Sequence, residues 1–445
     1  MTGNGAMPAW ARRDVFPDVT PRGIASSIAT SIRDDVIAPG EALPTVRDLA
    51  AELRVSPSTI SAAWGLLKRR GLIAGTGKSG VRVTSASGQV RRLELMSTVP
   101  GTRDLRLLHP DVSLLPALDQ ALIGAAQQPN LNEYYDSPIL PELETAIAPT
   151  WPVRSHHFAV ANGGADAIWA VLHAHSVPGD RVVVEMPTQP QLISLMVDLG
   201  LSIVPVPYGP DGLDERALRD ALQTLPAAVF LQPRSQAPTG RSMTRENRDR
   251  IVSHMSGRHQ PLVIEYDDLG PLSRREYWST AELRPAHTVV IRSYEKSYGP
   301  DLRLAVIGGP DEVIQRAHAE IRLTRQWTSR ILQSALLWML RDDATEQQVH
   351  RARAEYGARL DAFTEALRAR GVDVDSDDGF CAWVPVHDEG RTIEALALQG
   401  VVALRGESSW SAPNPPHVRI ATSRLPVEDA DAIADALVRT GEVTR

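Results

Sequence analysis

The sequence has almost no cysteine and no long apolar run. Its one cysteine, Cys381, cannot form an internal disulfide, so nothing points to secretion. No stretch approaches the roughly 18 apolar residues of a membrane span, and the start, MTGNGAMPAWARRDVF, lacks the apolar core of a signal peptide. The composition also excludes collagen-like, coiled-coil and disordered classes. We therefore expect a soluble cytoplasmic protein with no membrane partner and no metal site.

Positive charge is concentrated near the start of the chain. Residues 1–92 hold 13 Lys and Arg against 7 Asp and Glu, a net charge of +6. The remainder holds 34 against 47, a net charge of −13. This asymmetry indicates that only the first segment meets a polyanion, although uneven charge also arises by chance. At 445 residues, 43% of them hydrophobic, the chain is long enough for more than one domain.

The basic segment has the pattern of three helices and a hairpin. One apolar set recurs every four residues, as on one face of a helix: Ile24, Ile28, Ile32 and Val36. Thr45 can cap a second helix, and Ser56 followed by Pro57 is a typical start for a third. Two short runs, 72–74 and 80–84, then flank a glycine-rich tip.

This order of elements predicts a winged helix-turn-helix over residues 1–84, with its third helix in the major groove of DNA. The residues expected at the DNA are Arg47, Ser56, Ser58, Thr59, Ser61, Lys68, Arg69 and Lys78. A small helical cap with merely solvated charges would show the same charge pattern. The stretch PGEALPTVRDLAAELRVSPSTISAAWGLLKRRGLI resembles the DNA-binding domain of the GntR family, which favours DNA binding. In that family the arginine matched by Arg47 contacts DNA, whereas Pro57 stands where many members have arginine.

Beyond a polar, glycine-containing linker at 85–103, strand-like and helical patterns alternate. Strand-like runs are expected at 181–185, 202–206, 227–232, 262–266, 288–292 and 304–308. Helical patterns are expected at 189–199, 215–222, 245–255, 349–369 and 427–439. The alternation predicts an α/β fold with a mainly parallel sheet covered by helices on both faces. We expect a large subdomain over about 104–344 and a smaller α+β subdomain over about 345–445.

One lysine and one glycine pair in this body are candidates for chemistry. Lys296 follows a strand-like run, and a partly neutral amine there can form a Schiff base with an aldehyde. Gly163, Gly164 and Ala165 open a helix, so their N–H groups can hold a phosphate. An exposed loop lysine and an ordinary turn are the simpler interpretations.

The order of motifs resembles fold-type I pyridoxal-phosphate (PLP) aminotransferases. It runs through EYYDSPILPELETAIA, ANGGADAI, RVVVEMPTQP, GLDERAL, PRSQAPTG, VIEYDD, SYEKSYGPDLRLAVIGG and VRIATSRL. With the GntR-like segment in front, the whole chain resembles the MocR subfamily of bacterial transcriptional regulators. The resemblance implies that Lys296 binds PLP covalently and that Ser293 and Arg303 hold its phosphate. It also implies that Tyr134 reaches the partner's phosphate in a homodimer and that Arg419 pairs with a ligand carboxylate.

Positions around the cofactor ring depart from the aminotransferase pattern. In the run EYDD, Tyr266 aligns with the carboxylate that balances the pyridine nitrogen, and a neutral phenol cannot replace it. Asp267 can substitute only through a bulge or a one-residue slip, because neighbours in a strand face opposite sides. Ala237 and Gln189 stand where an asparagine and an aromatic are usual. Glu295 adds negative charge beside the lysine and opposes a phosphate if it faces the site.

The sequence leaves three functions open. The first is a DNA-binding regulator whose acidic body responds to PLP or to a carboxylate effector, with little or no transaminase turnover. The second is an active aminotransferase that carries an accessory DNA-binding module. The third is a regulator that has lost PLP and keeps the fold for dimerisation. The first accounts best for a basic module joined to a degraded catalytic site.

Overall fold

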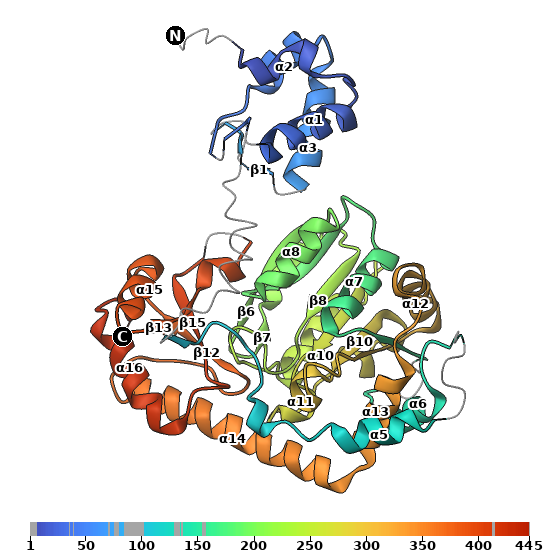
Figure 1. Cartoon of the computed structure of the whole chain (residues 1–445), viewed down its shortest axis with the longest axis vertical. Coiled ribbons are helices and arrows are strands. Elements are labelled where there is room, and N and C mark those ends of the chain that lie inside the picture. The colour runs from blue at the N-terminus through green and yellow to red at the C-terminus, as the bar shows by residue number, and fades with distance from the viewer. Residues whose placement is uncertain are drawn as a thin grey trace. The chain divides into compact units, whose positions relative to one another are not determined.

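The chain forms two compact units, residues 1–99 and 100–445, in the computed structural model (Figure 1). The structure describes residues 7–34, 36–38, 40–69, 72–74, 80–83, 102–128, 134, 137–153, 157–411 and 414–444, without the side chains of Arg22, Arg33, Lys68, Arg69 and Ala74. Lys78 and residues 85–101 of the expected linker lie outside the described residues.

The N-terminal unit contains three helices and a hairpin. Its elements are α1 (Pro21–Arg33), α2 (Val46–Leu53), α3 (Pro57–Arg69) and the antiparallel pair β1 (Ile73–Ala74) and β2 (Arg82–Val83). The hydroxyl of Thr45 accepts the N–H of Asp48 at 3.2 Å and so caps α2. The hydroxyl of Ser56 accepts the N–H of Thr59 at 3.2 Å at the start of α3. The expectation that Val36 continues the apolar face of the first helix is wrong, because α1 ends before it and Val36 is 58% exposed.

An eight-stranded sheet forms the centre of the large unit. Its strands lie in the order β4 (His157–Ala161), β11 (Ala305–Gly309), β10 (Thr288–Ser293), β9 (Leu262–Asp267), β8 (Ala228–Leu231), β5 (Arg181–Met186), β6 (Ser202–Gly209) and β7 (Gly212–Leu213). β11 and β7 run antiparallel to their neighbours, and the other adjacent pairs are parallel. The prediction of a mainly parallel sheet is confirmed.

Helices cover both faces of this sheet, as predicted. One face is covered by α7 (Gly164–His175), α8 (Pro190–Asp198) and α12 (Asp311–Arg325). The other is covered by α5 (Asp119–Ala126), α6 (Pro141–Ile147), α9 (Glu215–Leu222), α10 (Arg245–His254) and α13 (Arg330–Arg341). Successive strand residues serve the two faces, since on β9 Ile264 packs with the first set and Val263 with the second.

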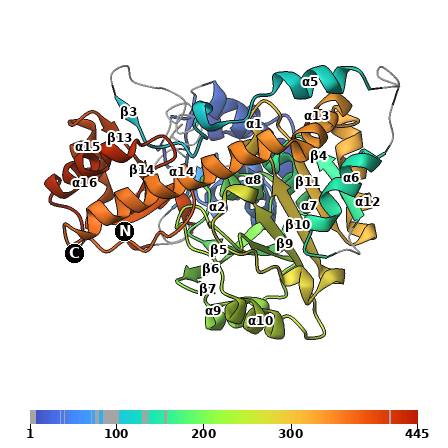
Figure 2. The same cartoon turned by 90° about the horizontal axis from the view of Figure 1, so that it is seen from below.

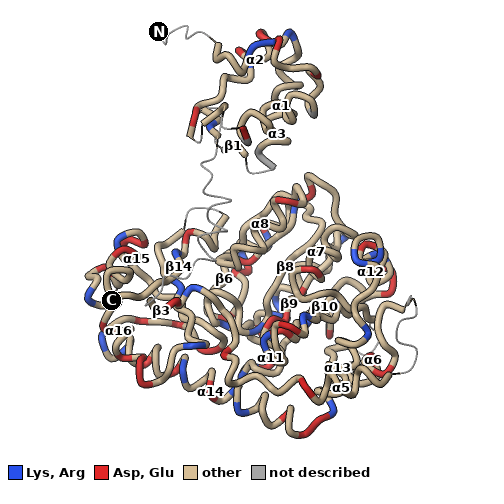
Figure 3. The backbone as a smooth tube through the Cα atoms, in the orientation of Figure 1, with Lys and Arg blue, Asp and Glu red and all other residues tan. Residues whose placement is uncertain are grey.

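The smaller subdomain is built on one antiparallel sheet. Its elements are β12 (Cys381–Pro385), β15 (His417–Ala421), β14 (Leu404–Arg405), α15 (Glu389–Ala397) and α16 (Ala430–Arg439). A 26-residue helix, α14 (Asp343–Arg368), packs on α16 and on α13 and so joins the two subdomains (Figure 2). Acidic and basic residues are interspersed along it (Figure 3). Among the described residues, no helix is long and apolar enough to cross a membrane.

The first described residues of the large unit belong to the smaller subdomain. β3 (Arg103–Asp104) pairs in parallel with β13 (Val401–Val402), and Leu105 is buried in the core of the smaller subdomain. The expectation that residues from about 104 onward belong to the large subdomain therefore fails for Asp104 and Leu105. Local sequence pattern does not reveal the pairing, because β3 and β13 are far apart in the sequence although they are neighbours in the fold.

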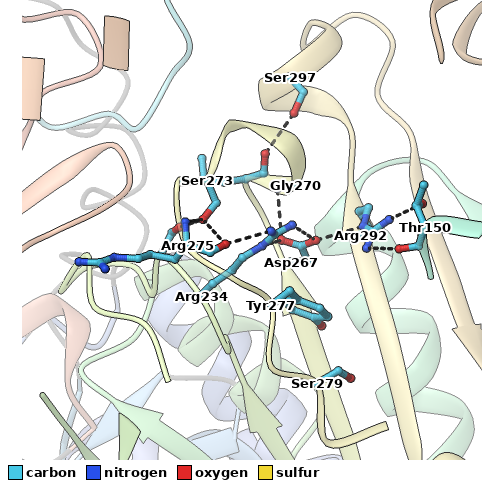
Figure 4. Close-up of polar contacts among 12 residues, drawn as sticks. Thr150, Arg234, Asp267, Gly270, Ser273, Arg275, Tyr277, Ser279, Arg292 and Ser297 are labelled. Atoms are coloured by element: carbon cyan, nitrogen blue, oxygen red, sulfur yellow. Dashed lines mark hydrogen bonds and ion pairs between the residues drawn. The ribbon is translucent and has the colours of Figure 1, made fainter. Parts of the chain in front are cut away.

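A buried carboxylate holds the carboxyl end of β9 in place. Asp267 accepts hydrogen bonds of 2.9 and 2.8 Å from Arg234 and one of 3.0 Å from Arg292 on β10 (Figure 4). Arg292 also donates to the hydroxyl and the carbonyl of Thr150. Burial alone raises the pKa of Asp267, but the two guanidinium groups outweigh it and hold the pKa below its ordinary value. These contacts tie together three segments that lie far apart in the chain.

We expect Asp267→Asn to destabilise the large unit by about 3–5 kcal/mol, because it leaves two buried cations without their counter-ion. Urea unfolding of the full chain, followed by circular dichroism, measures the loss. Since folding lowers the pKa of Asp267, its contribution is present above the ordinary pKa of 3.8 and is lost as pH falls through the folded value. Asp220→Asn, an exposed change on α9, should stay within about 0.5 kcal/mol. Equal losses in the two variants would contradict this role of Asp267.

Candidate functional site

The first turn of α3 presents hydroxyl groups to solvent, while its apolar residues pack in the core of the N-terminal unit. Ser56, Ser58 and Ser61 are exposed and Thr59 is half-buried. The hydroxyl of Ser56 lies 2.7 Å from that of Ser58 and 2.8 Å from that of Thr59. Arg47 is exposed on α2. The other predicted DNA contacts lie outside the described side chains: Lys68, Arg69 and Lys78.

Lys296 lies at the carboxyl end of the sheet, on the one-turn helix α11 (Glu295–Tyr298) that follows β10. Its amine pairs with the carboxylate of Asp268 at 2.5 Å and lies 5.3 Å from the centre of the Phe380 ring. The side chain is 14% exposed. The chain has only three lysines, and Lys296 is the single lysine beyond residue 78. The amine is therefore held in a partly buried place beside one counter-ion.

Tyr266 lies on the face of the sheet that α7 and α8 cover. Its phenol donates to Asp268 at 2.8 Å, and Gln189 at the start of α8 donates to the same carboxylate at 3.2 Å. A Cβ on Gly164 would lie 2.2 Å from the phenol oxygen, so this glycine permits the close approach. Burial, and then the charge of Asp268, raises the pKa of Tyr266 well above its ordinary value of 10.0. Tyr266 therefore brings a neutral group to the site.

Asp267 points to the opposite face. The ladder between β9 and β10 has no bulge or slip here, since Tyr266 stands opposite Ile291 and Asp267 opposite Arg292. The carboxylate is engaged by Arg234 and Arg292. Contrary to its place among the expected cofactor residues, Asp267 does not join the group around the lysine, because strand alternation turns it away.

Most of the expected phosphate residues meet at the N-terminus of α7. Gly163 is the N-cap, none of the described side chains caps the helix, and Ala165 is exposed in its first turn. Ser293 ends β10 and is buried. The side chain of Arg303 is 66% exposed, and its guanidinium lies 3.7 Å from the carboxylate of Glu295. A Cβ on Gly163 would lie 2.3 Å from that carboxylate and 3.5 Å from the Arg303 side chain.

Arg419 is a buried cation that forms no ion pair among the described residues. It lies on β15, is 5% exposed, and donates to the carbonyl of Arg106 at 2.5 Å. Within the described part of the chain its Nε has no hydrogen-bond partner. Burial lowers the pKa of Arg419. Burial raises the pKa of Cys381 on the adjacent strand β12, although the charges of Arg419 and Lys296 act in the opposite direction.

A small cavity lies beside Lys296. Lys296, Asp268 and Cys381 line a cavity of about 10 Å³, which holds about one water molecule. Tyr134 makes none of the described contacts around the lysine. It is 91% exposed, and its ring meets Trp327 edge to face at 5.6 Å.

Asp268 is the site residue that the sequence reasoning missed. It accepts from Lys296, Tyr266 and Gln189 at once. The signal was present, because Asp268 stands two residues after Tyr266 and extended residues two apart share a face. Arg234 was also missed, and no local pattern reveals that a loop arginine pairs with a strand carboxylate.

Two family models match the chain. Residues 105–437 match aminotransferase class I and II, and residues 20–83 match the bacterial regulatory proteins of the gntR family. Among solved structures, kynurenine aminotransferase of Pyrococcus horikoshii superposes with a TM-score of 0.73 at 18% identity, over 79% of this chain and 93% of that one. At this identity the likeness concerns the fold.

Two curated relatives span most of the chain. The vitamin B6 salvage pathway transcriptional repressor PtsJ of Salmonella typhimurium is 32% identical over 424 residues, which cover 92% of this chain and 96% of that protein. The HTH-type pyridoxine biosynthesis transcriptional regulator PdxR of Corynebacterium glutamicum is 24% identical over 369 residues, which cover 79% of each chain. The present chain belongs to the GntR family of bacterial transcriptional regulators, in the MocR-type group that joins a helix-turn-helix domain to an aminotransferase class I and II domain.

Proposed function

We propose that this regulator binds double-stranded DNA through α2 and α3 and responds to PLP, to a carboxylate effector or to both, with little or no transaminase turnover. The observation that carries the proposal is the separation of Lys296 from the strand carboxylate Asp267. Lys296 keeps a partly buried place near the turn that opens α7, while Asp267 is committed to two arginines on the other face. A pyridine ring beside Lys296 therefore has no strand carboxylate for its nitrogen and is a poor electron sink.

The side chains around Lys296 fit the aldehyde and the phosphate of PLP. Its amine can bind the aldehyde, and Arg303, Ser293 and the opening turn of α7 suit the phosphate. Bound PLP would supply an electron sink for bonds at the α-carbon of an amino acid, a weak one here because its ring nitrogen would lack a counter-ion. The neutral Tyr266 does not fit the role of counter-ion to the ring nitrogen. Because the amine of Lys296 pairs with Asp268 at 2.5 Å, an aldehyde that binds it must break this ion pair.

The relatives support a vitamin B6 compound as effector, since the names of two of them refer to vitamin B6 salvage and pyridoxine biosynthesis. We extend the proposal to a homodimer, in which the exposed ring of Tyr134 contacts the partner. Arg419 supports a carboxylate on the effector, because a buried cation without a counter-ion favours an anionic ligand. An effector changes DNA binding only if it binds two arrangements of the protein unequally.

Arg47→Glu should weaken DNA binding at least about tenfold at low salt, and it should lower the slope of log affinity against log salt by about 1. The probe is a duplex from the region upstream of the chain's own gene, titrated by gel shift at several salt concentrations. Arg12→Glu reverses the charge of an exposed arginine outside the three helices and controls for net charge. Equal affinities of the two variants would count against the proposed DNA interface.

Borohydride reduction after incubation with PLP should add one pyridoxyl phosphate to the peptide that contains Lys296. Lys68 and Lys78, the other two lysines, report non-specific labelling in the same digest. Lys296→Ala should abolish the label at this peptide. In a separate assay of the unaltered protein, turnover of L-alanine with 2-oxoglutarate should stay at background. An unlabelled protein, or label confined to Lys68 and Lys78, removes PLP from the proposal; clear turnover contradicts the proposed loss of catalysis.

Arg419→Leu should raise the free energy of unfolding by about 0.5–2 kcal/mol, because it removes a buried charge that lacks a counter-ion.

The same change, Arg419→Leu, should abolish the response to a ligand carboxylate. In the PLP-treated protein, L-alanine but not L-alaninamide should raise the unfolding temperature, and the variant should respond to neither. Arg405→Leu, an exposed change on β14, serves as the matched control. A response to L-alanine that survives Arg419→Leu places the carboxylate elsewhere.

A further inference from the structure

Glu295 turns toward the phosphate side of the site. It is the first residue of α11, and its carboxylate lies 3.7 Å from the guanidinium of Arg303. A Cβ on Gly163 would lie 2.3 Å from the same carboxylate. Gly163 is the N-cap of the 12-residue helix α7 and has a φ of +93°. The carboxylate of Glu295 therefore fills the space beside the N-terminus of α7.

This place suits an anion. The N-terminus of a helix carries partial positive charge, and Arg303 adds a full charge. The acid in the first turn of α7, Asp166, is engaged elsewhere, since it accepts the N–H of Asn162 at 2.9 Å and pairs with Arg325 at 2.6 Å. Among the described side chains, Glu295 is thus the acid that lies against both Gly163 and Arg303. A phosphate group bound here would contact the same two groups, the guanidinium of Arg303 and the N-terminus of α7.

Glu295 is held by charge alone. Among the described residues its carboxylate accepts no hydrogen bond, and 28% of its side chain is exposed. The pKa of Glu295 is raised, chiefly by burial. The positive charges of Arg303 and Lys296 act to lower this pKa, and the negative charge of Asp268 acts to raise it. An ion pair of 3.7 Å without hydrogen bonds is a weak restraint, so a competing anion can displace the carboxylate at a cost in affinity.

We propose that Glu295 sets the phosphate selectivity of this site, because its carboxylate competes with the phosphate of a vitamin B6 aldehyde for Arg303 and for the N-terminus of α7. The inference rests on the proposed binding of such an aldehyde at Lys296. It predicts that the phosphate group adds less to affinity here than an open anion site would give. The site then accepts the unphosphorylated aldehyde, pyridoxal, almost as well as PLP.

The test compares PLP with pyridoxal, which lacks the phosphate, on the full chain and on Glu295→Gln. Visible absorbance and quenching of the intrinsic tryptophan fluorescence report the dissociation constants without any activity. Glu295→Gln should tighten PLP binding by about tenfold, the effect of removing one repulsive charge at a partly buried site, and should leave pyridoxal within about twofold. Glu295→Ala repeats the measurement if the glutamine variant fails to fold.

Glu394→Gln, which removes one exposed acid on α15, is the control for net charge and should change neither constant. An unchanged ratio of PLP to pyridoxal affinity in both Glu295 variants overturns the inference while leaving aldehyde binding intact. A larger gain for pyridoxal than for PLP also overturns it. If neither ligand binds the unaltered protein or the variants, the proposed function itself fails, and the inference fails with it.

Discussion

The alternation of side chains along β9 is the constraint on which the large unit depends. An extended strand sends neighbouring residues to opposite faces of the sheet. Tyr266 therefore faces α7, and Asp267 faces Arg234 and Arg292. The acid that an aminotransferase-like scaffold could use for chemistry is instead part of the folded core. The end of the strand thus presents a neutral phenol on one face and a buried, paired carboxylate on the other.

The cations of the site already have partners within the chain. Lys296 forms an ion pair with Asp268, and Arg303 forms a longer one with Glu295. A ligand must exchange these internal carboxylates for its own groups, so its net affinity is the difference between two sets of ion pairs. Single acidic residues can therefore change the affinity of such a site for an anion. Arg419 differs from both, because no described carboxylate meets it.

The sequence predicted the elements whose signals are local. Hydrophobic runs revealed the parallel strands, and Thr45 and Ser56 marked two helix starts correctly. It did not predict β4 or the pairing of β3 with β13, because short strands are defined by partners distant in the chain. For the site, period-two alternation was enough to doubt Asp267 as a cofactor residue. The direction of Glu295 was left open, because one turn of helix after a strand is oriented by packing and not by pattern.

The long helix α14 has a mechanical consequence. At 26 residues it measures about 39 Å, and it contains no proline at which helices commonly kink. One end packs on α16 and the other on α13. The small sheet that carries Arg419 and the helices of the large subdomain are therefore held against one continuous element, and a tilt of that sheet would be passed along α14 toward its contact with α13.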